Sequence, residues 1–439
     1  MRAHLGLLGM ALSLSIATHA VEPWTLERAL SYAMTNNPDA RLARQRIAAA
    51  QAGVEQANAA VWPKLQFQSS YTRTDNPMMV FGSILAQRAY NYSSPPNFND
   101  LPGVDDLNVK GLVTAPIYAG GAISAGRAAA KAGTEAAKQD ALAVRNTLGF
   151  EVARAFYTVL KTRQFIRAAQ AAVNSYTNNV QISRQREFRG TLLRADLLDV
   201  EVRLAQARED LLRAHNAYAL AQRALRTLLG IESGEFEVAD TAPAIAAPAS
   251  GDFSGRPELA ALRQRQRAAE EQVRGAKSGY IPRLGAFGSV DYDRGWKMNG
   301  DGTSYTVGAL LQWDLWDGML TRAKVREAEA NLDQVRESER KLNLGLDLQL
   351  QEAQLNLNDA TERLTVTAKA VEQAAESEQL TRARFGQGLA LAVQLIDSET
   401  ALTAARVRQA DAEADRRIAV AAVRRALGLP QLDFSNQSR

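Results

Sequence analysis

Residues 120–188 read GGAISAGRAAAKAGTEAAKQDALAVRNTLGFEVARAFYTVLKTRQFIRAAQAAVNSYTNNVQISRQREF. The stretch contains no proline and is rich in Ala, Arg, Gln and Leu, so it predicts one uninterrupted helix. At a rise of about 1.5 Å per residue this helix is roughly 100 Å long, whereas a globular helix averages about 11–12 residues. A second proline-free stretch, residues 318–385, predicts another such rod. The chain is therefore organised around two long helices.

The composition excludes several classes of function. The chain has 439 residues, no cysteine and only three histidines. The absence of cysteine rules out a disulfide framework, a thiol nucleophile and a lipid anchor through Cys. His4 and His19 fall in a predicted leader, and His215 alone cannot supply a histidine cluster for a metal. A net charge of +4, with Arg interleaved among Glu and Asp, argues against nucleic-acid binding. We expect no enzyme, no cofactor and no metal site.

Residues 1–20 have the three parts of a secretory signal peptide. Arg2 gives the positive start, residues 5–16 form the apolar run, and small residues precede an expected cleavage after Ala20. The apolar run is too short to span a bilayer, and no later segment reaches about 18 apolar residues. A short buried helix is the alternative interpretation of this stretch. Export of the mature chain is the prediction.

Residues 21–230 form the first of two predicted repeats. Helical sequence covers residues 24–62, with a restart at Asn37-Pro38, and residues 119–229, with a turn at Arg189-Gly190. Between these helices, residues 64–73 and 107–117 alternate between apolar and polar side chains, which predicts two strands. Residues 75–106, which join the strands, are rich in Asn, Pro, Ser and Asp and predict a long exposed loop.

The same order of elements returns after a linker at residues 231–255. Residues 256–428 predict helices at 257–281 and 317–428 and strands at 283–293 and 304–315, before a tail at 429–439. Pro38 and Pro257 lie 219 residues apart, whereas Gly120 and Gly318 lie 198 apart, so the second strand pair has a loop 21 residues shorter. The chain therefore contains two copies of one module, in which a helix, two strands, a long helix and a further helix follow one another.

The predicted strands have one apolar and one polar face. This alternation is typical of an outer-membrane barrel with lipid outside and water inside. The polar positions expected to face the lumen include Gln66, Gln68, Lys110, Asp291 and Gln312. Four strands cannot close; two chains would give eight strands around a filled interior, and three would give twelve around a water-filled bore. We favour a homotrimer in which a 12-stranded β-barrel continues as a 12-helix α-barrel. A soluble sandwich is the alternative.

Aromatic residues gather where the helices meet the strands. Trp62, Tyr118, Trp313 and Trp316 lie at these junctions and suit the aromatic belt at a membrane interface. Aromatic residues at a junction are also common in cores, so that interpretation stays open.

The chain resembles the TolC-like outer-membrane factors. The resemblance rests on Trp24-Thr-Leu-Glu-Arg-Ala-Leu30, on the strand-to-rod passages Ala115–Gly121 and Trp313–Gly318, and on the turns Arg186–Gly190 and Arg384–Gly388. It covers essentially the whole mature chain. It implies a trimeric exit duct of a tripartite efflux pump or type I secretion system, in the outer membrane and extending into the periplasm. It also implies docking to a periplasmic adaptor and an inner-membrane transporter, and a collar made by the linker and the tail.

The resemblance also assigns residues at the inner end of the tunnel. It implies a periplasmic gate lined by Asp196, Asp199, Gln394 and Asp397, and adaptor docking at Arg189, Gly190, Gln387 and Gly388. Phe385 and Ala390 stand where some members carry a Tyr and an Arg that latch the closed state. One of Arg194, Arg382 and Arg384 is therefore expected to pair with the acidic gate residues. Ordinary exposed helix charges are the alternative for each gate residue.

A periplasmic coiled-coil adaptor or structural rod without a pore is the second functional hypothesis. Such proteins also carry long helical hairpins, but they lack pairs of amphipathic strands whose apolar face could contact lipid. An envelope enzyme that uses carboxylates alone is the third. Passive conduction through a gated tunnel is the hypothesis that the strands favour.

Overall fold

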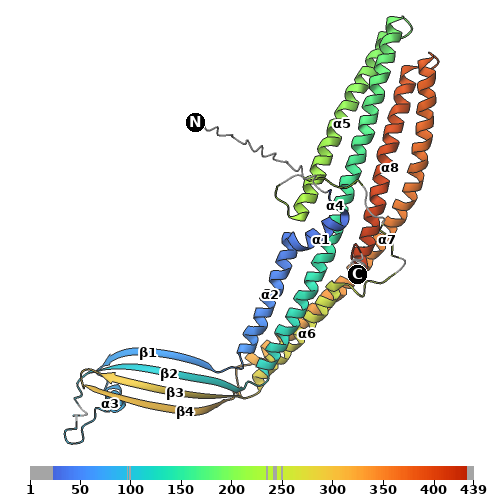
Figure 1. The fold of residues 1–439 in the computed structure, drawn as a ribbon. Helices are drawn as coiled ribbons and strands as arrows, with labels where there is room; N and C mark the ends of the chain where they lie inside the picture. Colours follow the sequence, from blue (N-terminus) through green and yellow to red (C-terminus); the bar gives the residue numbers. More distant parts are fainter. Residues whose placement is uncertain are drawn as a thin grey trace, which may run out of the picture. The chain divides into compact units, whose positions relative to one another are not determined.

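The computed structural model describes residues 23–95, 97, 100–233, 236–240, 245–248 and 251–432. The predicted leader, residues 1–20, and residues 433–439 of the predicted tail lie outside this described part. No helix in the described ranges combines the length and the apolar composition needed to cross a bilayer. The elements in chain order (Figure 1) are α1 (Leu26–Asn36), α2 (Pro38–Ala59), β1 (Lys64–Thr74), α3 (Pro77–Ala86), β2 (Val104–Tyr118), α4 (Ala122–Phe188), α5 (Arg194–Leu229), α6 (Pro257–Lys277), a 3₁₀ turn η1 (Ser278–Tyr280), β3 (Arg283–Gly295), β4 (Gly300–Gln312), α7 (Leu320–Gly386) and α8 (Ala392–Ala426).

The chain divides into two compact units. Among the described residues, the sheet unit comprises those within 41–145 and 252–350, and the helical unit comprises those within 23–40, 146–251 and 351–432. Both units take segments from both predicted repeats, and α4 and α7 each contribute to both. Packing therefore joins corresponding segments of the two halves rather than keeping each half separate.

The sheet unit holds one antiparallel sheet in the order β1-β2-β3-β4 (Figure 1). The pairing of β2 with β3 links the first half of the chain to the second. The register places Gln68 opposite Lys110 and Lys110 opposite Asp291, so these polar side chains share one face. The other face carries Phe67 and Tyr305, which are 75% and 80% exposed. The sheet thus has one polar and one apolar face, and its outer strands β1 and β4 have one neighbour each.

The joining segment between β1 and β2 corrects one prediction. Residues 75–106 are not simply an exposed loop, because they contain helix α3 and the first residues of β2. The Asn76 side chain accepts hydrogen bonds from the amides of Met78 and Met79 and caps α3, and Pro77 opens its first turn. Val80 and Ile84 are buried. The helix therefore has a packed side within a segment whose composition predicts a loop.

Several predicted boundaries also shift. The helical sequence predicted over residues 24–62, with a restart at Asn37-Pro38, forms α1 and α2, which meet at Asn37 and end at Ala59. The expected strand over 304–315 is β4 at 300–312. Asn37 explains the restart. Its side-chain oxygen accepts from the Asp39 amide at 2.7 Å, and its side-chain nitrogen donates to the Leu228 carbonyl at 2.7 Å, so it caps α2 and ties it to the end of α5.

Two apolar clusters hold the helical unit together. One joins α1, the middle of α4 and the end of α5 through buried residues such as Leu30, Phe156 and Leu225. The other joins the α4–α5 hairpin to the α7–α8 hairpin through Tyr176 and Phe385, among others (Figure 1). The second cluster lies next to the two turns at which gate and docking residues are predicted.

Gly230 provides a test of the junction between α5 and α1. Its φ is +74°, and a Cβ there would lie 2.9 Å from the Asn36 carbonyl oxygen. Gly190 has the same φ, but a Cβ added there would meet nothing within 4 Å. Gly190→Ala is expected to cost about 1 kcal/mol of backbone strain, and Gly230→Ala about 2 kcal/mol because the clash is added. Thermal melting of the purified protein should rank the variants in that order, and equal melting temperatures would contradict this account.

Candidate functional site

The ends of the two helical hairpins have the same backbone design. Gly190 and Gly388 lie 198 residues apart and both adopt positive φ, at +74° and +81°. The Thr191 amide donates to the Arg186 carbonyl at 2.9 Å, and the Leu389 amide donates to the Arg384 carbonyl at 2.8 Å. The predicted docking residues Arg189, Gly190, Gln387 and Gly388 lie in these two turns. Their docking role stays a prediction.

The predicted gate residues lie in the first two turns of α5 and α8. Asp199 and Asp397 are exposed and occupy the same position in the two repeats, whereas Asp196 is half-buried. Gln394 has a local structural role, because its side-chain oxygen accepts from the Leu391 amide at 3.2 Å and caps α8. Gating by the three carboxylates stays a prediction.

Arg382, one of the three arginines considered as partners of the gate carboxylates, pairs with other acidic residues in the structure. Arg382 Nη2 lies 2.5 Å from Glu399 Oε1 and 2.6 Å from Glu378 Oε1. Glu399 is only 3% exposed and also accepts hydrogen bonds from Ser175 and Asn179 of α4. The arginine therefore pairs with two buried glutamates instead, and these five side chains form the buried carboxylate cluster that joins α4, α7 and α8.

The cluster contains two carboxylates, but the arginine donates a hydrogen bond to only one of them. Arg382 Nη2 has two protons, and it donates to Ser175 and to Glu399. The Glu378 oxygen is at ion-pair distance without the alignment of a hydrogen bond. Burial, together with the adjacent Glu399 carboxylate, raises the pKa of Glu378 to about 7. Burial also acts to raise the pKa of Glu399, but hydrogen bonds from Ser175 and Arg382 hold it below its usual value.

The first repeat contains an exposed version of the same ion pair. Arg184 and Glu201 lie 198 residues before Arg382 and Glu399, and their side chains are 2.8 Å apart. The Arg184 side chain is 65% exposed, and Val180 stands where the second repeat has Glu378. The two repeats thus contain equivalent Arg–Glu ion pairs. In the second repeat the glutamate of the pair is buried, and a further carboxylate lies beside the arginine.

Arg186 directly connects the two hairpin ends. Its Nη1 donates to the Phe385 carbonyl at 2.8 Å, and its Nη2 donates to the Thr191 carbonyl at 3.3 Å. The guanidinium also lies 4.8 Å from the centre of the Phe385 ring. The sequence comparison of Phe385 with a family Tyr did not reveal this contact. A signal was present, since an arginine precedes each turn glycine by four residues.

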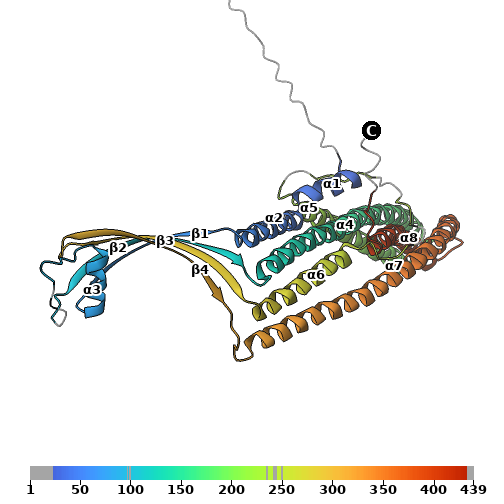
Figure 2. The ribbon, with the colours of Figure 1, turned by 90° about the horizontal axis from the view of Figure 1, so that it is seen from below.

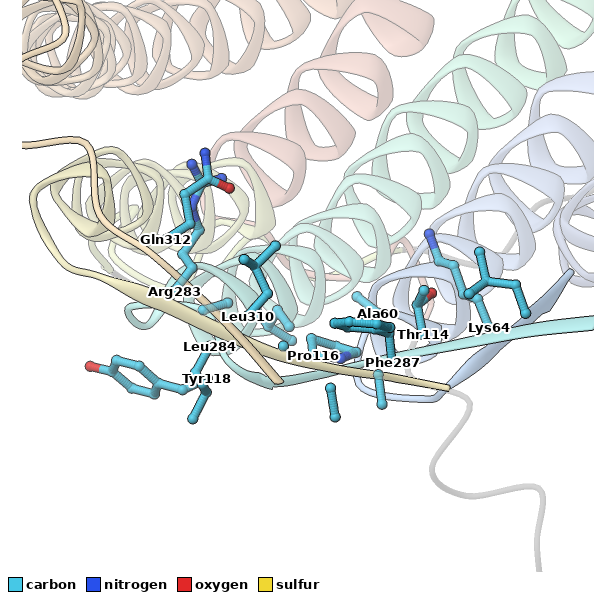
Figure 3. Close-up of a pocket in the computed structure, with 16 residues that line it drawn as sticks. Ala60, Lys64, Thr114, Pro116, Tyr118, Arg283, Leu284, Phe287, Leu310 and Gln312 are labelled. Carbon is cyan, nitrogen blue, oxygen red and sulfur yellow. The ribbon is translucent and has the colours of Figure 1, made fainter. Parts of the chain in front are cut away.

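The five predicted lumen residues share the polar face of the sheet. The register places Gln66, Gln68, Lys110, Asp291 and Gln312 on this face, and Lys110 Nζ lies 3.3 Å from Asp291 Oδ1. At the end of the sheet nearest the helices, the same face lines a hollow of about 690 Å³ (Figure 3). Lys64 and Arg283 bring positive charge to it. The polar face has the side chains that would suit the lining of an aqueous channel.

The predicted interface aromatics are exposed at the strand-to-helix junctions. Trp62, Tyr118, Trp313 and Trp316 have exposed fractions of 69%, 51%, 56% and 74%. The Trp313 indole nitrogen donates to the Tyr280 carbonyl at 3.2 Å. Exposure of four large aromatic side chains at the strand-to-helix junctions suits a membrane interface, and this role stays a prediction.

Parts of the predicted linker and tail meet in the helical unit. The Arg424 side chain donates to the carbonyls of Pro430 and Ala246 at 2.8 and 3.5 Å. Trp24 bridges to the other end of the linker, with its amide donating to the Glu237 carbonyl at 2.7 Å. The described parts of residues 231–255 and 429–432 thus pack onto helices, and a collar built from them stays a prediction.

Comparisons with known proteins agree with this arrangement. The model of the family described as "Outer membrane efflux protein" matches residues 29–231 and 253–429. The chain is 27% identical over 280 residues to the alkaline protease secretion protein AprF of Pseudomonas aeruginosa, a match that covers 58% of this chain and 56% of AprF. It is 24% identical over 303 residues to the outer membrane protein TolC of Vibrio cholerae, covering 65% of this chain and 68% of TolC. The chain thus spans less than two thirds of the length of AprF.

The solved structures show the same fold. The outer membrane protein VceC of Vibrio cholerae superposes with a TM-score of 0.77 at 18% identity, covering 93% of this chain and 97% of VceC. The predicted fold class, mainly helical with a membrane β-barrel portion, is confirmed by this likeness.

Proposed function

The chain belongs to the outer membrane efflux protein family, whose members are outer-membrane channels rather than enzymes, and we propose that it forms a homotrimeric exit duct of an efflux or secretion system. In this proposal, residues 1–20 direct export and are removed after Ala20. In the same proposal the mature chain is not lipid-anchored through Cys, since it contains no cysteine. A periplasmic adaptor and an inner-membrane transporter are the partners, and the pump supplies the energy for transport.

The sheet carries the proposal. It has four strands, two outer edges, and an apolar face whose Phe67, Tyr305 and Val307 are at least 75% exposed in the single chain. Edge strands with open hydrogen-bonding groups need neighbours, and exposed apolar side chains need a cover. Three copies supply twelve strands, which satisfy both needs by closing a barrel in lipid. A periplasmic rod without a pore would leave these side chains in water.

Purification and reconstitution test this proposal directly. The mature protein should fractionate with outer membranes, migrate as a trimer in detergent and conduct ions in planar bilayers. A water-soluble monomer without conductance would overturn the channel proposal and favour the rod.

Asp397→Ala tests the gate within the same preparation. Three copies of Asp397 and Asp199 would place carboxylate rings in the narrow end of the pore, where they attract and bind cations. The substitution should therefore weaken block by divalent cations by about tenfold, or raise the open probability. Asp415→Ala is the matched control, because Asp415 lies in the same helix and makes an exposed pair with Arg363. Equal block of Asp397→Ala, Asp415→Ala and wild type would remove Asp397 from the gate.

A further inference from the structure

Helix α3 packs on the polar face of the sheet. Gln87, which directly follows the helix, is fully buried, and its side-chain nitrogen donates to the Asp105 carbonyl at 2.8 Å and to Asp106 Oδ1 at 2.9 Å. Asp106 is on the same face as Asn108 and Lys110, because alternate residues of a strand point the same way. Figure 2 shows α3 beside the sheet at the end away from the helices that join it.

Three glycines of the β3–β4 hairpin make room for this helix. Gly295 and Gly300 are register partners, and Gly302 pairs with Asp293 on the same polar face. A Cβ at Gly300 would lie 2.6 Å from the Gln87 carbonyl oxygen and 2.7 Å from Ala89 Cβ. A Cβ at Gly302 would overlap the Ala86 carbonyl, and one at Gly295 would overlap the Gln87 amide. The hairpin of the second repeat thus lacks side chains at the positions covered by α3.

The two sides of α3 differ. Val80 and Ile84 are buried with Val104 of β2 in a small apolar cluster. Met78 and Met79 are 81% and 52% exposed. The helix is therefore anchored along one side and presents methionines on the other. Because the second strand pair has a short turn, the described chain supplies one such helix.

We infer that α3 is an outer constriction, folded into the barrel mouth and anchored to the lumen face by Gln87 and the glycine cradle. This inference rests on the proposed channel, in which the polar face lines the bore. Three copies bring three α3 helices, with their exposed methionines, into one mouth. An apolar constriction opposes the passage of water and ions, so the mouth is a second barrier, separate from the periplasmic gate.

The natural absence of cysteine permits a direct accessibility test. Thr306→Cys puts a single thiol on the lumen face, four residues or about 13 Å further into the barrel from Gly302. Intact cells carrying this reporter are treated with a bulky maleimide–polyethylene glycol that does not cross the outer membrane. Gly302→Leu, which displaces α3, should raise the labelling rate at least about tenfold, because the rate follows the population of the open mouth.

Gly111→Leu is the matched control. Gly111 lies on the apolar face, and its Cβ would be 4.0 Å from the Val290 carbonyl, so the substitution adds the same side chain without touching α3. Gln87→Glu is a second variant that keeps the size of the side chain but places a carboxylate beside Asp106. It should also increase labelling, and it decides the question if Gly302→Leu does not assemble.

The outcomes separate this inference from the channel proposal. Suppose that the reporter protein alone and its Gly302→Leu and Gln87→Glu variants all assemble as outer-membrane trimers and are labelled at the same rate, whether that rate is high or zero. In that case α3 is not a barrier, and only the constriction is overturned. If no trimer is found in the outer membrane for the reporter protein itself, the channel proposal fails and the constriction fails with it. Faster labelling of both α3 variants, with Gly111→Leu unchanged, supports the constriction.

Discussion

Arg382→Met is expected to lower the free energy of local opening at the ends of the helical hairpins by about 3 kcal/mol at pH 8. Amide exchange in the first turns of α8 should therefore be more than about a hundredfold faster. The substitution leaves Glu378 and Glu399 buried side by side without their cation. Breaking a buried ion pair by removing one partner costs about 3–5 kcal/mol, and we take the lower end because the Arg382 side chain is 42% exposed. Hydrogen exchange with mass spectrometry on the purified protein measures the effect.

Arg184→Met is the control that the duplication provides. It removes the equivalent arginine from the exposed pair with Glu201, which is worth about 0–1 kcal/mol. Exchange in the first turns of α5 should therefore rise by no more than about fivefold. Similar effects of the two substitutions would show that burial of the second pair has no energetic consequence.

The effect of Arg382→Met should shrink on acidification. In the wild type, the pKa of Glu378 is raised to about 7 from its usual value of 4.5, so the folded state binds a proton more tightly than the unfolded state. The contribution of Glu378 protonation to the free energy of unfolding is fully present below about pH 4.5 and is lost as the pH rises to about 7. The pKa of Glu399 is lowered, so the contribution of the ionised Glu399 to the free energy of unfolding is lost only when the pH falls below the usual pKa range of a glutamate. Between about pH 5 and 8, Glu378 therefore dominates, and a lower pH stabilises the cluster.

In the variant, a proton shared between the two carboxylates can replace part of the missing positive charge. The difference in exchange between Arg382→Met and wild type should thus be larger at pH 8 than at pH 5.5. Glu378→Gln removes the titrating group, so the protection of the α8 amides, corrected for the intrinsic pH dependence of exchange, should be nearly independent of pH across this interval. Persistence of the full pH dependence in Glu378→Gln would assign it to another group.

The face of each strand could be predicted from sequence because it depends only on a period of two. Gln66, Lys110 and Asp291 are far apart in the chain, yet the alternation alone placed them on a common face. Helix α3 was missed for a local reason. Its apolar residues run consecutively and show no helical period, and the only signal was the Asn76-Pro77 cap, the same pair that marks the start of α2 at Asn37-Pro38.

The buried carboxylate cluster needed the tertiary structure. Glu399 is buried because Ser175 and Asn179 of α4, more than 200 residues earlier, reach its carboxylate. The sequence does show the pairs Arg184–Glu201 and Arg382–Glu399 at one spacing. It does not show which of them is covered by another helix, because that depends on how the two hairpins pack.

Arg186→Ala is expected to favour the open form of the hairpin ends. The wild-type guanidinium makes a charge-assisted hydrogen bond of 2.8 Å to the Phe385 carbonyl and lies over the Phe385 ring. A hydrogen bond of this kind contributes about 1.5–3 kcal/mol and the ring contact about 0.5–1 kcal/mol, so we expect a loss of about 2–3 kcal/mol per protomer. In planar bilayers this loss should raise the open probability by at least about tenfold.

Arg384→Ala is the corresponding control. Arg384 occupies the position of Arg186 in the second repeat, 198 residues later, and is exposed. Loss of one positive charge near the turns is common to both variants, so a difference between them isolates the contact with Phe385. Arg186→Lys keeps the charge but loses the planar fork, and it should give an intermediate open probability. Equal open probabilities for Arg186→Ala and Arg384→Ala would rule out a connecting role for Arg186.

The position of this contact suggests how docking could open the channel. The predicted docking residue Gly388 is next to the contact, since its Cβ would lie 3.5 Å from Arg186 Nη2. A partner that binds the two turns could therefore displace the guanidinium from Phe385 without reaching the buried carboxylate cluster. On this view, Arg186→Ala should lessen the need for the adaptor in opening, whereas Arg382→Met should loosen the helices behind the turns. Measuring conductance of each variant with and without added adaptor distinguishes the two effects, and an unchanged adaptor requirement in Arg186→Ala would contradict the first.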